Sequence, residues 1–432
     1  MKKRIISGCL LLMMMTGLLG GCGNSGDDGS AVEGNGEKPE LTFWIRGSET
    51  EGICRSLQED IDEYNAREGS KAYVTVEYVP LGDFATKFNA AFAGGTAPDI
   101  VETGVDQISI RAHMGQYLAL DDYIEDWGNA DQIIDAYMEA GKMLDDGKQY
   151  GLAYAPTPCV FVWRKDFFEE AGLDPDTPPK DWDEMLEFAK QLVVKDGDTV
   201  VRGGFSLEPS DYRLFTLMAR QAGCHLYDPE TNMPEIADEA GIKTLQFFAD
   251  IQPYSILYNP APGANTLRSF LTSESAMAYV TTEEISAMIE NDPSLEEKIG
   301  ISSYVPAKDG TNSTWCGYRL FAVNAASKYP DEAWDVISWL MTEESNRNRM
   351  EKANIPPAYK TLSEEYIQMN EKINLPASEA ISVGEPFPKT DWMTSYGEAV
   401  KNAQQEVLYG EKSAEDALQD AETLIKTDAD LG

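Results

Sequence analysis

Short runs of β-branched and aromatic residues alternate with amphipathic helical segments along this chain, and this alternation restricts the fold class more than any other feature. Residues 41–45 (LTFWI) and 73–79 (YVTVEYV) have the composition of strands, and residues 52–68 between them have helical periodicity. This is the pattern of a β-α-β unit. Strands that alternate with helices in this way predict an α/β fold.

Three later segments carry the signals of helix starts. Asp181 and Glu184 have the spacing of a capping box. Pro330 precedes apolar residues at helical spacing, and Ser413 opens a last helix after a break at Gly410. No repeat of roughly 34 to 40 residues is visible, which argues against a solenoid.

The length and the charge of the chain narrow its organisation and its partners. The chain has 432 residues, and 42% of them are hydrophobic, so it can bury a large core. This length exceeds that of one compact domain and therefore predicts two lobes. The formal net charge is −39 at pH 7. A surface this anionic argues against binding to nucleic acid and against adsorption on acidic lipid headgroups.

The N-terminus has the pattern of an export signal that ends at a lipid-attachment cysteine. Residues 1–4 are basic, residues 5–19 are almost entirely apolar, and LGGC closes the run at Cys22. This resembles a bacterial lipoprotein signal peptide. The apolar run is short for a helix that crosses about 30 Å of hydrocarbon. We therefore expect residues 1–21 to be a signal peptide and Cys22 to be lipidated, which places the protein on the outer face of the bacterial cell membrane.

The polar stretch that follows, together with the remaining cysteines and histidines, predicts a tether and no cofactor site. Residues 22–40 are nearly all Gly, Asp, Asn, Ser and Glu, which predicts a flexible linker. No CxxC spacing is present, and His113 and His225 have no neighbouring ligand cluster, so we expect no metal and no cofactor. Four cysteines remain whose pairing, or lack of it, the sequence leaves open: Cys54, Cys159, Cys224 and Cys316.

Six segments occur in an order that is typical of one protein family. They are residues 41–46 (LTFWIR), 92–101 (FAGGTAPDIV), 149–154 (QYGLAY), 164–184 (opening RKDFFEEAGL), 270–279 (FLTSESAMAY) and 317–327 (GYRLFAVNAAS). In this order they resemble the extracellular solute-binding proteins of bacterial carbohydrate importers of the ABC type. The resemblance covers essentially the whole chain. It implies a periplasmic-binding-protein-like fold of two α/β lobes, joined by several hinge crossings, with a solute in the cleft between them.

The resemblance also implies domain bounds and a function. Lobe 1 would comprise residues 41–154 and 307–356, and lobe 2 residues 155–306 and 357–432. The protein would be a monomer that captures a carbohydrate, in our interpretation an oligosaccharide, by lobe closure. It would deliver this ligand to the transmembrane subunits of an ABC permease, while ATP hydrolysis takes place in other subunits, because this chain has no G-x-x-x-x-G-K-[ST] loop. We therefore expect no enzymatic activity.

The chemistry of a sugar ring indicates which side chains to look for. A pyranose has an apolar C–H face that packs on aromatic rings, and its hydroxyls require both donors and acceptors. Open α/β sheets place ligand loops at the carboxyl ends of strands. Trp44 and Arg46 end the first strand, with Trp44 equally expected in the core. Asp106 follows residues 98–101, where the family often has a sugar-binding carboxylate, although it could instead cap the next helix.

The remaining candidates lie at the lobe crossings and in loops where relatives contact solute. Tyr154 is at the first crossing. The family often has a Trp just after the strand that here contains Ala276 and Met277, but this chain has Thr282 and Glu283 there, which would form hydrogen bonds instead. Trp315 could compensate for that missing ring. The candidates in these positions are Tyr154, Glu208, Tyr212, Thr282, Glu283, Trp315, Tyr318 and Trp392, of which Trp315 and Trp392 are the first expected stacking platforms.

Two other functions stay open at this point. A binding protein for a different solute, such as a polyamine or a peptide, fits the same fold and the acidic charge. A secreted glycoside hydrolase would need two suitably spaced carboxylates, which 74 Asp and Glu residues could provide. The family resemblance argues against the hydrolase.

Overall fold

The structure is a computed structural model that describes residues 38–143, 146–257, 269–390 and 392–429. The predicted signal peptide, the lipidation site Cys22 and nearly all of the predicted linker lie outside these residues. Within the described ranges, no helix is both long enough and apolar enough to cross a membrane.

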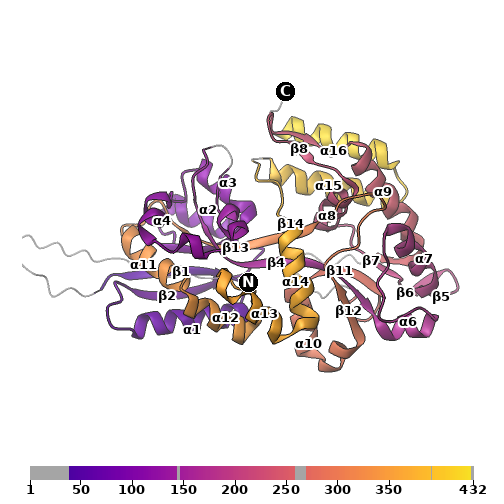
Figure 1. Ribbon diagram of the computed structural model, residues 1–432. Coiled ribbons are helices and arrows are strands. Elements are labelled where there is room, and N and C mark those ends of the chain that lie inside the picture. Colours follow the sequence, from indigo (N-terminus) through magenta and orange to yellow (C-terminus); the bar gives the residue numbers. More distant parts are fainter. Residues whose placement is uncertain (1–37, 144–145, 258–268, 391, 430–432) are drawn as a thin grey trace, which may run out of the picture. The chain divides into compact units, whose positions relative to one another are not determined.

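A mixed sheet with the strand order β11-β4-β13-β3-β1-β2 is the framework of the fold (Figure 1). The predicted β-α-β unit is confirmed as β1 (Glu40–Arg46), α1 (Gly52–Ala66) and β2 (Tyr73–Val79). The two strands pair in parallel along their full lengths, and β3 (Ile100–Gly104) joins β1 on the other side, also in parallel. The carboxyl ends of β1, β2 and β3 therefore meet at one edge of the sheet.

Two long antiparallel strands continue the sheet. These are β4 (Leu152–Arg164) and β13 (Thr314–Val323), and β13 lies between β3 and β4. The second half of β4 pairs with β11 (Met277–Thr281) and β12 (Ile299–Ser302). A register shift in β13 lies between Arg319 and Leu320.

Buried side chains form two large hydrophobic cores. The first core takes its residues from between 41 and 155 and between 316 and 366. The second core takes its residues from between 159 and 279, from 305–307 and from between 387 and 425. Within the described residues the chain passes between the two cores three times: inside β4, just before β13, and after the end of α14 (Glu371–Val383). A smaller third cluster lies around β4, β11 and α14.

The helices follow this division. The first core is covered by α2 (Phe84–Gly94), α11 (Pro330–Leu340) and α12 (Glu343–Ala353), and the second by α7 (Trp182–Leu192), α8 (Tyr212–Ala222), α9 (Glu239–Ile251), α15 (Met393–Leu408) and α16 (Ala414–Asp428). Further elements are α3 (Val105–His113), α4 (Asp121–Trp127), α5 (Asp135–Ala140), α6 (Lys165–Ala171), β5 (Val194–Asp196), β6 (Thr199–Arg202), β7 (Phe205–Leu207), β8 (Leu226–Asp228), β9 (Met233–Glu235), β10 (Ser255–Leu257), α10 (Thr282–Asn291), α13 (Ser363–Met369), α14 (Glu371–Val383) and β14 (Gly384–Glu385).

The predicted helix starts are confirmed, with one correction. The Asp181 carboxylate caps α7 by accepting from the Glu184 backbone N–H at 2.9 Å. The capping box is incomplete, however, because the Glu184 carboxylate accepts from the backbone of Lys180 at 2.7 Å instead. Ser413 caps α16 by accepting from the Asp416 N–H at 3.1 Å. Capping of this kind satisfies N–H groups that have no partner within the helix.

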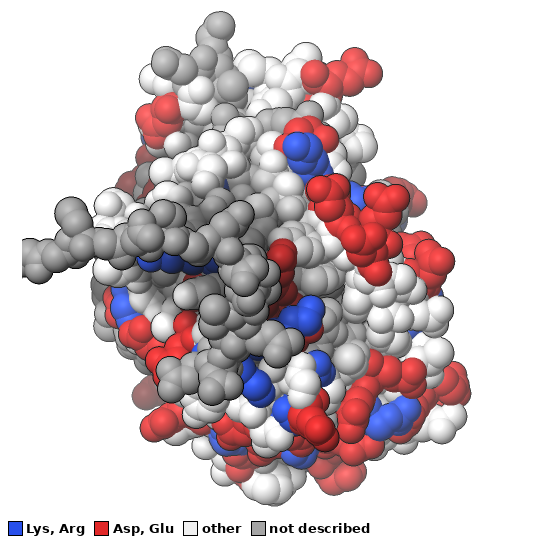
Figure 2. All heavy atoms as spheres, turned by 90° about the vertical axis from the view of Figure 1, so that its left-hand side faces the viewer, with Lys and Arg blue, Asp and Glu red and all other residues white. Residues whose placement is uncertain are grey.

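Two further sequence questions are answered by the structure. The four cysteines of the described part are buried and form no disulfide with one another. Acidic side chains are spread over the face in Figure 2, with Lys and Arg side chains among them, as the strongly negative net charge indicates.

Candidate functional site

Arg46 and Glu102 form a buried ion pair at the carboxyl ends of β1 and β3. The guanidinium donates from Nη2 to Oε1 at 2.8 Å and from Nε to Oε2 at 3.0 Å, and the Arg46 backbone N–H also donates to Oε2 at 3.0 Å. The Glu102 side chain has no exposed surface. Burial alone would lower the pKa of Arg46, but Glu102 raises it above its ordinary value. A bidentate, charge-assisted contact of this kind fixes both side chains.

Arg319 on the adjacent strand β13 extends this ion pair towards the second core. Its Nε lies 3.8 Å from Glu102 Oε1 and 3.9 Å from Glu283 Oε1, and its Nη2 donates to the Arg46 carbonyl at 3.4 Å. Burial would lower the pKa of Arg319, whereas Glu102 and Glu283 hold it above its ordinary value. The Nη1 atom is buried and has no hydrogen-bond partner among the described residues. We call Arg46, Glu102, Arg319 and Glu283 the charge chain.

Glu283 is the accessible end of the charge chain. It lies in the first turn of α10, which begins directly after β11 and is closed by a capping box between Thr281 and Glu284. Its side chain is 47% exposed, yet desolvation raises its pKa against the opposing effect of Arg319, and Glu102 raises it further. Because it is exposed, the Glu283 carboxylate can accept hydrogen bonds from a solute. Thr282 beside it is buried.

Asp106 and Tyr212 approach this site from the two cores. Asp106 is in the first turn of α3, whose N-cap is Gly104, so the alternative that Asp106 caps this helix does not hold. A Cβ atom on Gly104 would lie 2.3 Å from Asp106 Oδ1 and 2.8 Å from Arg46 Nη1, which places these two side chains side by side. Burial raises the pKa of Tyr212, and among the nearby charges that of Asp106 raises it most.

Trp315 lies on the same strand as Arg319 and packs against Gly317. A Cβ atom at position 317 would lie 2.4 Å from Trp315 Cη2 and 2.7 Å from Thr157 Oγ1. The Arg213 guanidinium is 5.4 Å from the centre of the indole ring, and the Phe387 ring is 5.2 Å away. The Trp315 Nε1 atom is buried, and no atom in the described part of the chain forms a hydrogen bond with it. An aromatic ring and a set of charged donors and acceptors thus meet along β13.

Replacing Gly317 by Ala is expected to displace the Trp315 ring and to lower the free energy of unfolding by about 1 to 3 kcal/mol, the usual cost of overpacking. Urea unfolding and the near-ultraviolet circular dichroism of tryptophan measure the two effects. The matched control is Gly82→Ala, because a Cβ atom at position 82 has no neighbour within 4 Å. Equal behaviour of the two variants would contradict the packing of Trp315 on Gly317.

The structure places four other predicted residues inside the cores. Trp44 packs against Phe88, with 6.4 Å between the ring centres, and Tyr154 stacks on Phe321 at 4.2 Å. These four side chains leave little ring surface for a solute: Trp44 is 6% exposed, Tyr154 0%, Tyr318 4% and Trp392 2%. The indole N–H of Trp392 donates to the Asn232 carbonyl at 2.9 Å.

Glu208 is buried in the loop before α8, close in sequence to Tyr212. Sequence reasoning missed Glu102, Arg319, Arg213 and Phe387. A signal was available for the first two, because each is a charged residue inside an otherwise apolar strand, in IVETG and in YRLFAV. Charged residues are rarely fully buried unless they are paired.

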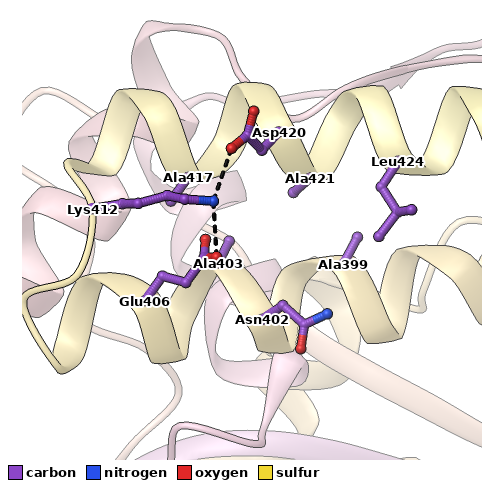
Figure 3. A pocket seen from close by; sticks show the side chains of 9 residues that line it. All are labelled: Ala399, Asn402, Ala403, Glu406, Lys412, Ala417, Asp420, Ala421 and Leu424. Carbon is purple, nitrogen blue, oxygen red and sulfur yellow. Dashed lines mark hydrogen bonds and ion pairs between the residues drawn. The ribbon is translucent and has the colours of Figure 1, made fainter.

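A recess of about 190 Å³ lies elsewhere, between α15 and α16 (Figure 3). Small side chains such as Ala403 and Ala417 leave this space, and Lys412 closes it with contacts of 2.8 Å to Glu406 and 2.8 Å to Asp420. None of the predicted site residues lines this recess. In the described ranges, no group of three His, Cys, Asp or Glu residues is arranged to hold a metal ion.

Residues 60–376 match the sequence profile of the bacterial extracellular solute-binding proteins. The chain is 28% identical over 231 residues to the probable amino-acid ABC transporter periplasmic-binding protein y4oP of Sinorhizobium fredii, a match that spans 52% of this chain and about half (48%) of that protein. It is 23% identical to the galactooligosaccharide-binding protein of Bacillus subtilis, over 94% of this chain and 93% of that protein.

The fold is also similar to solved structures. One is an ABC transporter solute-binding protein from Thermotoga lettingae, crystallised with alpha-D-tagatose, which superposes with a TM-score of 0.78 at 19% identity over 90% of this chain and 99% of that one. This likeness confirms the predicted two-lobed α/β fold class.

Proposed function

Because the chain belongs to the bacterial extracellular solute-binding proteins, a family that acts outside the cytoplasm, we propose that its solute is a carbohydrate, specifically an oligosaccharide, which it hands to the membrane subunits of an ABC importer. A relative that matches nearly the whole chain is a galactooligosaccharide-binding protein, which supports the choice of sugar. The match to y4oP, named as a probable amino-acid transporter component, makes an amino acid or a peptide the second candidate.

The observation that carries the sugar proposal is that Trp315 and Arg319 lie on one face of the same strand, four residues apart. A pyranose ring could pack its C–H face on the indole, while its hydroxyls reach the Glu283 and Asp106 carboxylates and the Arg319 guanidinium. Trp315 Nε1 and Arg319 Nη1 are buried donors without a partner, and hydroxyl oxygens would satisfy them. Of the other predicted residues, Arg46 and Tyr212 border this place.

Capture would proceed by closure of two lobes about the three crossing segments. A ligand held first by one lobe gains further contacts when the second approaches, and it favours the closed form by its differential affinity for that form. We assign residues 41–154 and 314–366 to lobe 1, and residues 155–313 and 384–432 to lobe 2. This moves the predicted bounds at 307 and 357, because Ala307 belongs to the second core whereas Leu362 and Tyr366 belong to the first. The protein acts as a monomer, tethered to the membrane through a lipid on Cys22, and catalyses no reaction.

A thermal-shift screen of the full-length chain tests this proposal. Galacto-, arabino- and manno-oligosaccharides are compared with amino acids, short peptides and polyamines, since a ligand that binds only the native state raises the melting temperature by mass action. A shift with one saccharide series, with the sugar recovered intact, is the expected result. A shift with amino acids or peptides alone would overturn the sugar assignment, and recovery of cleaved sugar would indicate a hydrolase.

The variant Trp315→Ala locates the site in the same assay. It is expected to weaken saccharide binding at least tenfold by titration calorimetry, because the ring that packs against the sugar face is removed. Trp334→Ala is the matched control: that ring packs on Tyr123 in the first core, with 5.5 Å between the ring centres. Unchanged affinity in Trp315→Ala would contradict this placement of the site.

A further inference from the structure

Every guanidinium at the candidate site already has a carboxylate partner. Arg46 is held in a bidentate contact by Glu102, and Arg319 lies between Glu102 at 3.8 Å and Glu283 at 3.9 Å. The third is Arg213, which lies against Trp315 and contacts Asp211 Oδ2 at 3.2 Å and Glu284 Oε2 at 3.9 Å. An acidic ligand group would have to compete with these carboxylates, because three cations in the site are shared among at least four anions.

Further carboxylates lie around the same place. Asp106 borders Arg46, and Glu51, at the start of α1, acts electrostatically on both Glu283 and the Cys54 thiol. The pKa of Glu283 is raised by desolvation and also by Glu102, Glu284 and Glu51, with Arg319 opposing them. The neighbouring carboxylates therefore already oppose the negative charge of Glu283.

From this arrangement we infer that the site selects saccharides without negative charge and rejects those that carry a carboxylate or a sulfate. The inference rests on the proposed function and narrows its substrate class. A uronate ring placed on Trp315 would bring a second carboxylate close to Glu283 and Asp106 and would lose its own hydration there. A neutral hydroxyl at the same position can donate to either carboxylate, and an amino group would also find a partner in them.

The two buried donors agree with a neutral ligand. Arg319 Nη1 and Trp315 Nε1 need acceptors, which hydroxyl or ring oxygens provide without added charge. The Arg319 guanidinium is electrostatically balanced by two carboxylates, so it offers a hydrogen bond to the ligand more than a free positive charge.

Titration calorimetry of the full-length chain with matched sugar pairs tests the inference. The probes are galactobiose against digalacturonate and cellobiose against cellobiouronate, with the glucosamine dimer as the amino-bearing member. In at least one series we expect the neutral sugar to bind 100-fold or more tightly than its acidic counterpart. An acidic member that binds within tenfold of the neutral one overturns the inference while leaving the sugar-binding function intact. Binding of amino acids or peptides and of none of these sugars overturns the proposed function, and the inference with it.

The double variant Asp106→Asn/Glu283→Gln assigns the selectivity to named residues. It is expected to narrow the ratio between neutral and acidic sugars at least tenfold. Glu77→Gln, which removes an exposed carboxylate paired with Lys87, controls for the change in net charge and should leave the ratio unchanged. An unaltered ratio in the double variant, or an equal change in Glu77→Gln, would show that these carboxylates do not set the selectivity. The assignment would then be overturned.

Discussion

Replacing Glu102 by Gln is expected to lower the free energy of unfolding by about 3 to 5 kcal/mol, the usual cost of removing one partner of a buried ion pair. Gln keeps the shape of the side chain and some hydrogen bonds, but the Arg46 and Arg319 guanidinium groups would lose the carboxylate that they share and keep only Asp106 and Glu283 nearby. Glu102 has no exposed surface, and both arginines approach its carboxylate within 4 Å. Urea unfolding monitored by circular dichroism gives the difference.

The matched control for this change is Glu77→Gln on β2. The Glu77 carboxylate also contacts a cation, Lys87, but it is 52% exposed. Exposed ion pairs contribute about 0 to 1 kcal/mol because water screens both partners. A loss in Glu102→Gln that does not exceed the loss in the control would show that the charge chain is solvated in the native protein, against its burial in the structure.

Replacing Arg349 by Leu is expected to have an effect of similar size, far from the candidate site. Arg349 on α12 pairs with Asp60 on α1, and neither side chain has exposed surface. The guanidinium also donates to the Leu340 carbonyl at 2.7 Å, and Asn348 Nδ2 donates to Asp60 at 2.6 Å. Removal of the arginine leaves a buried carboxylate that only Asn348 stabilises. We expect a loss of about 3 to 5 kcal/mol near neutral pH.

The pH dependence of this loss distinguishes an electrostatic cause from lost packing. Burial raises the pKa of Asp60 already, against the effect of Arg349, so loss of that arginine raises it further. A carboxylate whose pKa is higher in the folded state destabilises the protein as pH rises through the interval between the unfolded and the folded pKa. The difference in the free energy of unfolding between wild type and Arg349→Leu should therefore become smaller as the pH falls towards 4. A deficit that is constant between pH 4 and pH 7 would contradict this account.

Two variants complete the comparison. Arg347 lies on the same helix, but its side chain is 37% exposed and pairs with Glu343 and Glu365. The variant Arg347→Leu should therefore lower the free energy of unfolding by less than about 1 kcal/mol. The double variant Asp60→Leu/Arg349→Leu should recover part of the loss, because replacing both members of a buried pair by apolar residues leaves no unpaired charge.

Local sequence patterns predicted the local structure well. The bounds of β2 match the predicted strand, and α11 and α16 begin where Pro330 and Ser413 indicate. These features depend on neighbouring residues, through periodicity and capping. The placement of β13 between β3 and β4 could not be predicted in this way, because it depends on pairing between segments far apart in the chain.

The candidate site was predicted only in part for the same reason. Arg46 and Glu102 are 56 residues apart, so no local pattern links the two side chains. Trp315 and Trp392 were equal candidates for a stacking ring, but burial separates them: Trp392 is enclosed in the second core, whereas Trp315 is only partly buried. Residue type indicates which chemistry is available, and tertiary packing decides which side chains of that type can face a ligand.

The central position of β13 also affects how the chain can fold while it is being made. β13 separates β3 from β4, but it begins at Thr314, whereas β4 ends at Arg164. At a synthesis rate of 5 to 20 residues per second, roughly 8 to 30 s pass between the emergence of the two strands from the ribosome. During that interval β3 and β4 each lack their shared neighbour and have an open edge that could pair with another chain. The sheet that joins the two cores therefore cannot be completed before residue 323 is available.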